Sequence, residues 1–454
     1  MIRNPWVQVS QFEGTLSPLS DRDRHLKNYL GVVSLIPKQR WLRIIPVAVG
    51  MYTIAFVDRT NISMALPSMM RDLHMDPPQA GNVAGVFFWG YLLLQIPGGH
   101  LANCWSAKLL ISILLVAWGV CAVGCGLIQT WQELCVMRFL LGVAEGAVWP
   151  ITLVLLSHWF PRKERARANA LWMVCLPLAV IVSAPFSGWI LDHWNWRIMM
   201  VAEGALPFLW LVVWQVVIYD HPRDAKWVSP AEREYLESTI ERELMDAKLP
   251  MPNSPLLAFI YPQVLLLTLI CFLRNVADFG FLIWLPTAME NAKKLSNSEV
   301  GGLITIPFIV GIGAMILNSW HSDKSGERSR HMSLTFAVGG IFLLAGVVLS
   351  RQWPNAAFVC VCLTAVGTNG CLGPFWAIPT ETLPPESAGP TMGFINSIGN
   401  LGAFFGSLAI GYINKGTGGF LYGFGLVGTS MLIASVACLL LKSSRHPSMI
   451  ERLA

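Results

Sequence analysis

The sequence predicts an all-α membrane protein with twelve transmembrane helices in two pseudo-symmetric six-helix bundles. Of its 454 residues, 54% are hydrophobic and only 13% are charged, whereas an average globular protein is about 25% charged. Twelve apolar runs are each long enough, at roughly 20 residues, to cross a bilayer. A polar stretch separates the sixth run from the seventh, so the chain divides into six plus six helices.

The two predicted bundles comprise residues 43–219 and 262–441. In the first bundle we expect spans at about 43–68, 80–103, 107–129, 132–157, 166–191 and 198–219. In the second we expect them at about 262–287, 300–321, 332–350, 355–379, 388–412 and 418–441. Repetition of six-helix halves about an axis along the membrane normal is a known way of building transporters.

Three polar segments remain outside the bundles: residues 1–42, the central loop 220–261 and the tail 442–454. In the central loop, Leu236, Ile240 and Leu244 recur at helical spacing after Pro230, which predicts an amphipathic helix on the membrane surface. With both termini in the cytoplasm, 23 lysines and arginines fall on the cytoplasmic side and six outside. The positive-inside rule therefore predicts this orientation in the cell inner membrane.

Composition argues against several other classes of protein. Because the basic excess follows the predicted topology, it does not indicate a nucleic-acid partner. Nine of the ten cysteines lie in apolar runs without metal-ligand spacing, so we expect no disulfide and no metal site. No nucleophile or cofactor motif is found, so we expect no enzyme activity and no cofactor.

Four charged residues occur inside two of the predicted spans. Asp58 and Arg59 are adjacent in the first span, and Arg138 and Glu145 lie in the fourth. Arg138 and Glu145 are seven residues apart, about two helical turns, and therefore share one face. Charges at bilayer depth cost at least a few kcal/mol each unless they are paired. We expect one cluster of two acids and two bases, in which protonation of a carboxylate frees an arginine for an anion; a static salt-bridge network is the alternative.

A second pair of charges lies in the seventh span. Arg274 and Asp278 are four residues apart and so share a helix face. One interpretation is that Arg274 binds a substrate carboxylate and Asp278 masks the arginine when the site is empty. The other is an ion pair that only stabilises the helix.

The motifs in these spans resemble those of the major facilitator superfamily, and within it the anion:cation symporter group, which imports small organic anions. The resemblance covers about residues 40 to 442. The sequence differs from the family pattern in the turn after the second helix, where Asn103, Cys104 and Ser106 replace an acid, a base and a glycine. The motifs that carry it are residues 58–62, 88–91 with 95–99, 138–145, 159–161 with 164–166, 225–227, 284–286, 375–376 with 379–380, and 396–402.

This resemblance implies roles for the charged and polar residues of the spans. Asp58 and Glu145 would carry the coupled proton, and Arg138 would lie near the translocation path. Arg59 would either pair with the acids or bind the anion, and Arg274 is a further candidate anion ligand. Three side chains are expected to line the cavity, with core packing as the alternative role: Tyr91, Trp376 and Asn396.

The predicted function is therefore import of a small organic anion by proton symport, through alternating access, in a functional monomer. The anion would be a carboxylate of aromatic or sugar-acid type. Leu176 and Pro177 stand where sugar-acid members of the group often have a glutamine, which disfavours aldonates because leucine cannot hydrogen-bond a polyol. Two alternatives remain on the same fold: an exporter or antiporter of organic anions or drugs, and a transport-dead sensor.

Overall fold

The computed structural model describes residues 39–246, 261–293, 295–382 and 385–441, and nearly all of these residues are helical. Within this part of the chain, eleven helical stretches are long and apolar enough to cross a membrane. Several of these stretches consist of two consecutive helices. The predicted all-α membrane fold is thus confirmed. Most of the predicted segment 1–42, the whole tail 442–454 and residues 247–260 of the central loop lie outside the described residues.

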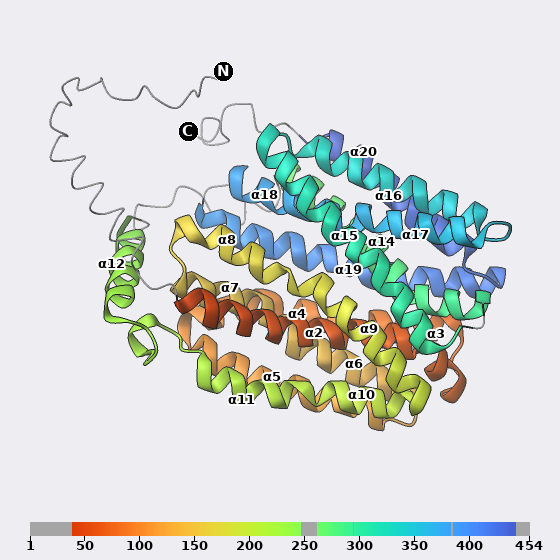
Figure 1. Ribbon diagram of the computed structural model, residues 1–454, viewed down its shortest axis with the longest axis horizontal. Helices are drawn as coiled ribbons and strands as arrows, with labels where there is room; N and C mark the ends of the chain where they lie inside the picture. Colours follow the sequence, from red (N-terminus) through yellow and green to blue (C-terminus); the bar gives the residue numbers. More distant parts are fainter. Residues whose placement is uncertain (1–38, 247–260, 294, 383–384, 442–454) are drawn as a thin grey trace, which may run out of the picture.

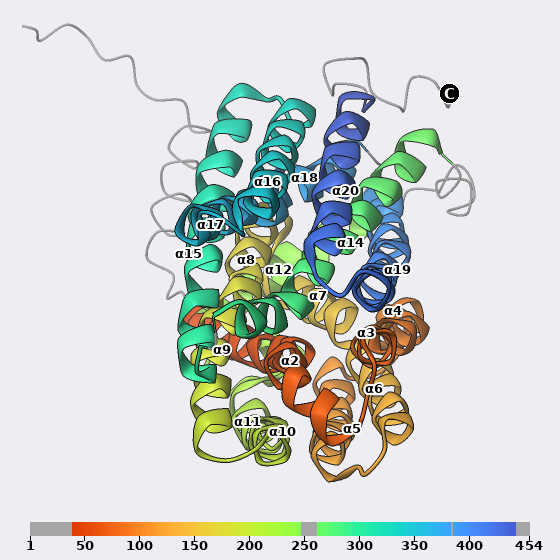
Figure 2. The same cartoon turned by 90° about the vertical axis from the view of Figure 1, so that its right-hand side faces the viewer.

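The N-terminal half occupies the lower part of Figures 1 and 2. The predicted span at 80–103 is formed by two helices in succession, which meet at Val86, and it is not one of the eleven candidate spans. The helices of this half are α2 (Gln39–Asp72), α3 (Pro77–Gly85), α4 (Phe87–Cys104), α5 (Ala107–Leu127), α6 (Trp131–Gly146), α7 (Val148–Trp159), α8 (Arg162–Met173), α9 (Cys175–His193), α10 (Trp196–Gly204) and α11 (Leu206–Val217).

The C-terminal half occupies the upper part of the same views. Its helices are α14 (Pro262–Lys293), α15 (Asn297–Ser325), α16 (Ser329–Leu349), α17 (Pro354–Gly370), α18 (Leu372–Thr382), α19 (Pro385–Thr417) and α20 (Leu421–Leu439). In the sequence, the two halves are separated by a short 3₁₀ helix, η1 (Pro222–Asp224), and by α12 (Pro230–Asp246).

Helix α12 lies in the central loop, where the sequence predicts an amphipathic helix, and it is attached to the N-terminal half. The side chain of Leu236, on α12 itself, is fully buried. Arg40 at the start of α2 is also buried, and its guanidinium lies 2.5 Å from the Glu232 carboxylate of α12 and 2.7 Å from that of Glu164. This ionic contact fixes α12 to the start of α2.

Within each half, glycines allow two helix backbones to touch. A Cβ atom on Gly142 of α6 would lie 2.0 Å from the carbonyl oxygen of Phe87, and one on Gly402 of α19 would lie 2.1 Å from that of Phe272 on α14. Small residues at such crossings let transmembrane helices approach closely. These contacts hold α4 on α6 and α14 on α19.

The two halves meet most closely at the end of the molecule opposite α12 (Figure 1). There α9 crosses α15 and α3 crosses α19, and a Cβ atom on Gly301 or Gly411 would lie 2.2 or 2.4 Å from a carbonyl oxygen of the other half. At the other end, α8 and α18 pack against helices of their own halves.

Polar contacts reinforce this end, and together they form what we call the interhalf latch. It consists of two ion pairs and one helix cap. Lys415 Nζ lies 2.8 Å from Asp76 Oδ2, and Arg71 Nη1 lies 3.0 Å from Glu290 Oε1. Asp192 of α9 accepts hydrogen bonds from the backbone N–H groups of Asn297 and Ser298, at 2.9 and 2.8 Å, and so caps the start of α15.

Candidate functional site

A cavity with about 860 Å³ of empty volume, its mouth included, lies between the two halves. Five of the predicted site residues line it: Arg59, Tyr91, Arg274, Trp376 and Asn396. Three do not: Asp58, Arg138 and Glu145. Arg59 is therefore the residue through which the charges of the N-terminal half reach the cavity.

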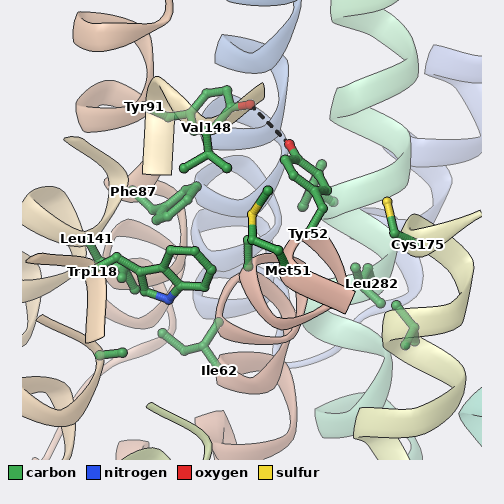
Figure 3. Close-up of a cluster of buried hydrophobic side chains, with 14 of the residues drawn as sticks. Met51, Tyr52, Ile62, Phe87, Tyr91, Trp118, Leu141, Val148, Cys175 and Leu282 are labelled. Carbon is green, nitrogen blue, oxygen red and sulfur yellow. Dashed lines mark hydrogen bonds between the residues drawn. The ribbon is translucent and has the colours of Figure 1, made fainter. Parts of the chain in front are cut away.

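Arg59 is held by an ion pair and by a group of aromatic rings. Its Nε donates a 2.7 Å hydrogen bond to Glu145 Oε2, and the Glu145 side chain is fully buried. The guanidinium carbon lies 4.5 Å from the centre of the Tyr91 ring and 5.3 Å from that of Tyr52. The two tyrosine hydroxyls approach to 3.4 Å above Phe87 (Figure 3). Among the described residues, Nη2 of Arg59 has no hydrogen-bond partner.

Asp58, the neighbour of Arg59, makes different contacts. Its carboxylate accepts a 2.6 Å hydrogen bond from Nε1 of Trp118 on α5. Arg138 donates to the backbone carbonyl oxygen of Asp58, at 2.8 Å, and not to the carboxylate. The expected four-charge cluster is thus assembled, but within the described part of the chain only Arg59 and Glu145 form an ion pair in it. Consecutive helix residues point about 100° apart, so Asp58 and Arg59 reach different neighbours.

The second arginine of the cavity, Arg274, lies on α14 in the C-terminal half. Its Nη2 lies 3.1 Å from Asp278 Oδ2, so the ion pair predicted from the four-residue spacing is present. Its Nε donates to the carbonyl oxygen of Thr368, and its Nη1 donates to Asn275 Oδ1, both at 2.9 Å. Arg274 is therefore oriented by three acceptors while it faces the cavity.

Several cavity residues could not be found from local sequence patterns. Asn275, Asn369 and Asn400 line the cavity beside the predicted Asn396, and Asn275 Nδ2 lies 3.4 Å from Asn400 Oδ1. Asn400 lies on α19 within the motif 396–402, whereas Asn275 on α14 and Asn369 on α17 lie in none of the motifs. A further buried acid, Glu203 on α10, also lies in no recognisable motif.

Comparison with known proteins identifies the family. The sequence profile described as Major Facilitator Superfamily matches residues 48–407, and a second, overlapping match covers residues 288–452. The chain belongs to the Major Facilitator Superfamily. The family resemblance predicted from the motifs is thereby confirmed, and this member of the superfamily is a membrane transporter by family.

Similar proteins cover almost the full length of this superfamily member. A protein of Agrobacterium vitis that is named for tartrate transport is 33% identical over 411 residues, which are 88% of this chain and 93% of the relative. A quinolone resistance transporter of Acinetobacter baumannii is 28% identical over 87% of this chain and 92% of its own. A solved D-xylose–proton symporter superposes with a TM-score of 0.71 at 14% identity, over 90% of this chain and 99% of its own, and so shares the fold.

Proposed function

We propose that this transporter imports a small hydroxylated organic anion together with protons, by alternating access. The observation that carries the proposal is that Arg59 and Arg274, one from each half, line the same cavity. Arg59 also retains a guanidinium nitrogen without a partner among the described residues. Arginine binds carboxylates with two parallel hydrogen bonds, so an anion held between these residues would contact both halves at once.

The other polar residues of the cavity favour an anion that carries hydroxyl groups. The four asparagines Asn275, Asn369, Asn396 and Asn400 offer amide donors and acceptors on the side of Arg274. The relative named for tartrate transport points to the same chemistry. The aromatic rings of Tyr52, Phe56 and Tyr91 would then enclose the carbon chain.

Proton coupling would act through Glu145. In the structure its carboxylate neutralises Arg59, and a proton on Glu145 would remove that charge and leave Arg59 free for the anion. Asp58 is the second proton-handling acid of this proposal. Arg138, which does not line the cavity, would position Asp58 through its backbone carbonyl.

For the transport cycle we propose that bundles 43–219 and 262–441 rock about the central cavity within a monomer. In the cell inner membrane, with both termini in the cytoplasm, the interhalf latch would lie on the outer face. The structure would then represent a state closed to the outside. The latch contacts, and the packing of α8 and α18 against helices of their own halves, support this assignment.

The test is transport of tartrate by the purified protein in proteoliposomes. We expect an inward proton gradient to drive accumulation, and added tartrate to acidify the lumen.

Arg59→Lys and Arg274→Lys should each weaken tartrate binding by about tenfold or more, because a hydrogen bond to a charged group contributes about 1.5–3 kcal/mol. Arg330→Lys, at an exposed position, is the matched control. Glu145→Gln should retain tartrate counterflow but lose accumulation.

The quinolone relative supports one competing function, drug export by antiport. Tartrate-driven alkalinisation of the lumen, or full accumulation by Glu145→Gln, would contradict proton symport. Thermal stabilisation by quinolones and not by any of a panel of hydroxylated acids would favour export, since a specific ligand stabilises the folded protein by mass action.

A further inference from the structure

Glu203 is a fully buried acid of the N-terminal half that lies away from the cavity. Its side chain on α10 is 0% exposed, and it is not among the cavity-lining residues. Helix α10 packs against α5, α2 and α9. The backbone of the neighbouring Gly204 is so close to α5 that a Cβ atom there would lie 2.7 Å from Val123 N. Water therefore has little access to this carboxyl group from the side of α5.

The Glu203 carboxyl group has too few partners for a stable negative charge. Ser187 Oγ of α9 donates a 2.6 Å hydrogen bond to Oε1. Oε2 is buried and has no hydrogen-bond partner among the described residues. An ionised carboxylate in an apolar interior costs far more than one neutral hydrogen bond returns, so such a group takes up a proton instead.

A proton on Oε2 would also satisfy a second unpaired atom. The side chain of Asn61 on α2 interacts with the Glu203 carboxyl group. Asn61 Oδ1 is buried and, within the described chain, has no hydrogen-bond partner. An amide can turn its oxygen toward an O–H donor. The protonated acid thus completes a chain from Ser187 through Glu203 to Asn61, one turn along α2 from Asp58.

Among the described residues, the groups around Glu203 include Asp58 but no cation. Asp58 and Asn61 come from α2, and Ser187 comes from α9. On α10 itself the nearest charge is Arg197, six residues or roughly 9 Å along the axis, where it contacts Asp72 at 3.5 Å. Asp58 lies fourteen residues, roughly 21 Å, from Asp72 along α2. Glu203 is therefore intermediate in depth between the latch end and Asp58.

We propose that Glu203 is a third proton-binding site of the N-terminal half, which takes up and releases a proton during the transport cycle. It lies between the latch end and Asp58, on a route separate from the substrate cavity. The proton comes from the aqueous phase on the latch side and bonds to Oε2. This inference rests on the proposed proton coupling, so its test includes one measurement that does not depend on transport.

The first measurement compares variants in proteoliposomes with tartrate as the probe. Glu203→Gln keeps the shape of the side chain but cannot release a proton. It should retain counterflow exchange and lose accumulation driven by a proton gradient. Ser187→Ala keeps the carboxyl group and removes its hydrogen bond, so it should shift the pH dependence of accumulation without abolishing it. Glu241→Gln, at an exposed position of α12, should match the wild type.

The second measurement is infrared spectroscopy of the purified protein without substrate. The wild type should show a protonated-carboxyl C=O band that disappears in Glu203→Gln and persists in Glu241→Gln. Absence of this difference would overturn the proposal even if tartrate is not transported. Wild-type accumulation by Glu203→Gln would overturn it as well, and so would joint loss of counterflow and accumulation, because that result indicates a structural role. If the infrared band is assigned to Glu203 but no organic acid is transported, the proposed substrate fails and the protonated site remains.

Discussion

At Asp58, a buried carboxylate depends on a single tryptophan. The Trp118 indole N–H is its 2.6 Å hydrogen-bond donor, and both side chains are almost fully buried. Removal of one partner leaves the other polar group unsatisfied, which costs about 1–3 kcal/mol and more for a charged group. The Trp118–Asp58 contact is therefore expected to stabilise the packing of α2 on α5.

A double-mutant cycle can measure this contact. Trp118→Phe alone should lower the free energy of unfolding in detergent by more than the same change in an Asp58→Leu background, in which the side chain cannot accept the hydrogen bond. The coupling energy should fall within about 0.5–3 kcal/mol. Trp353→Phe, at an exposed position, is the control. A coupling energy near zero would mean that the hydrogen bond contributes nothing to stability.

Residue identity predicted which charges would meet, but not which atoms would pair. The cost of charges at bilayer depth required Asp58, Arg59, Arg138 and Glu145 to lie together. The pairing depended on where α5 places Trp118, and one tryptophan among 19 carries no local signal for that role. The contact between Asn275 and Asn400 was not predicted for a similar reason, since it joins residues 125 positions apart.

At the scale of helices, the close glycine crossings are of two kinds. Gly142 and Gly402 join helices within one half, whereas Gly301 and Gly411 join helices of opposite halves. A methyl group in the first kind of crossing would strain every state of the molecule. In the second kind it would strain only the state in which the halves touch at the latch.

We therefore expect Gly301→Ala to favour the state that is open at the latch end. Spin labels on α9 and α15 near the latch, in a background without native cysteines, should show a longer distance population in this variant than in the parent. Gly313→Ala on the same helix is the control, because its Cβ atom would meet nothing within 4 Å. Gly402→Ala should instead destabilise the fold, by about 1–3 kcal/mol, without shifting the distances. Unchanged distances in Gly301→Ala would contradict the assignment of this crossing to one state.

The positions of the helices were largely predictable because a span needs a long apolar run. The breaks inside spans were not predicted: α3 and α4 meet at Val86 in the second span, and α6 and α7 divide the fourth in the same way. The crossings between halves were not predictable either. Single glycines recur in many helices, and the partner backbone is distant in the sequence.

For the whole molecule, the interhalf latch joins the two halves at one end. The hydrogen bond from Lys415, together with that from the backbone N–H of Gln79, lowers the pKa of Asp76 below its ordinary value of 3.8. A carboxyl group with a lowered pKa stabilises the latched state above its ordinary pKa, and this contribution is lost as the pH falls through the lowered value. Mild acidification should therefore leave the ion pair intact.

The expected outcome is a latch-side distance that is unchanged between about pH 7 and pH 5 and lengthens only when the pH falls below the ordinary pKa of 3.8. Lys415→Met should weaken the latched state over the whole neutral range, and Arg330→Met, which removes an exposed arginine at a distant pair, should not. The same spin-label distances in lipid nanodiscs test this. Opening between pH 7 and pH 5 that persists in Asp76→Asn would assign the pH response to other groups.

The contact between Trp118 and Asp58 also gives the protein an intrinsic spectroscopic reporter. An indole N–H resonance moves with the charge of its acceptor, and this indole is hydrogen-bonded directly to Asp58. In protein labelled with ¹⁵N at tryptophan, the resonance that Trp118→Phe removes would follow protonation of Asp58 in the intact transporter. Proton binding could then be observed at a single residue, before any substrate has moved.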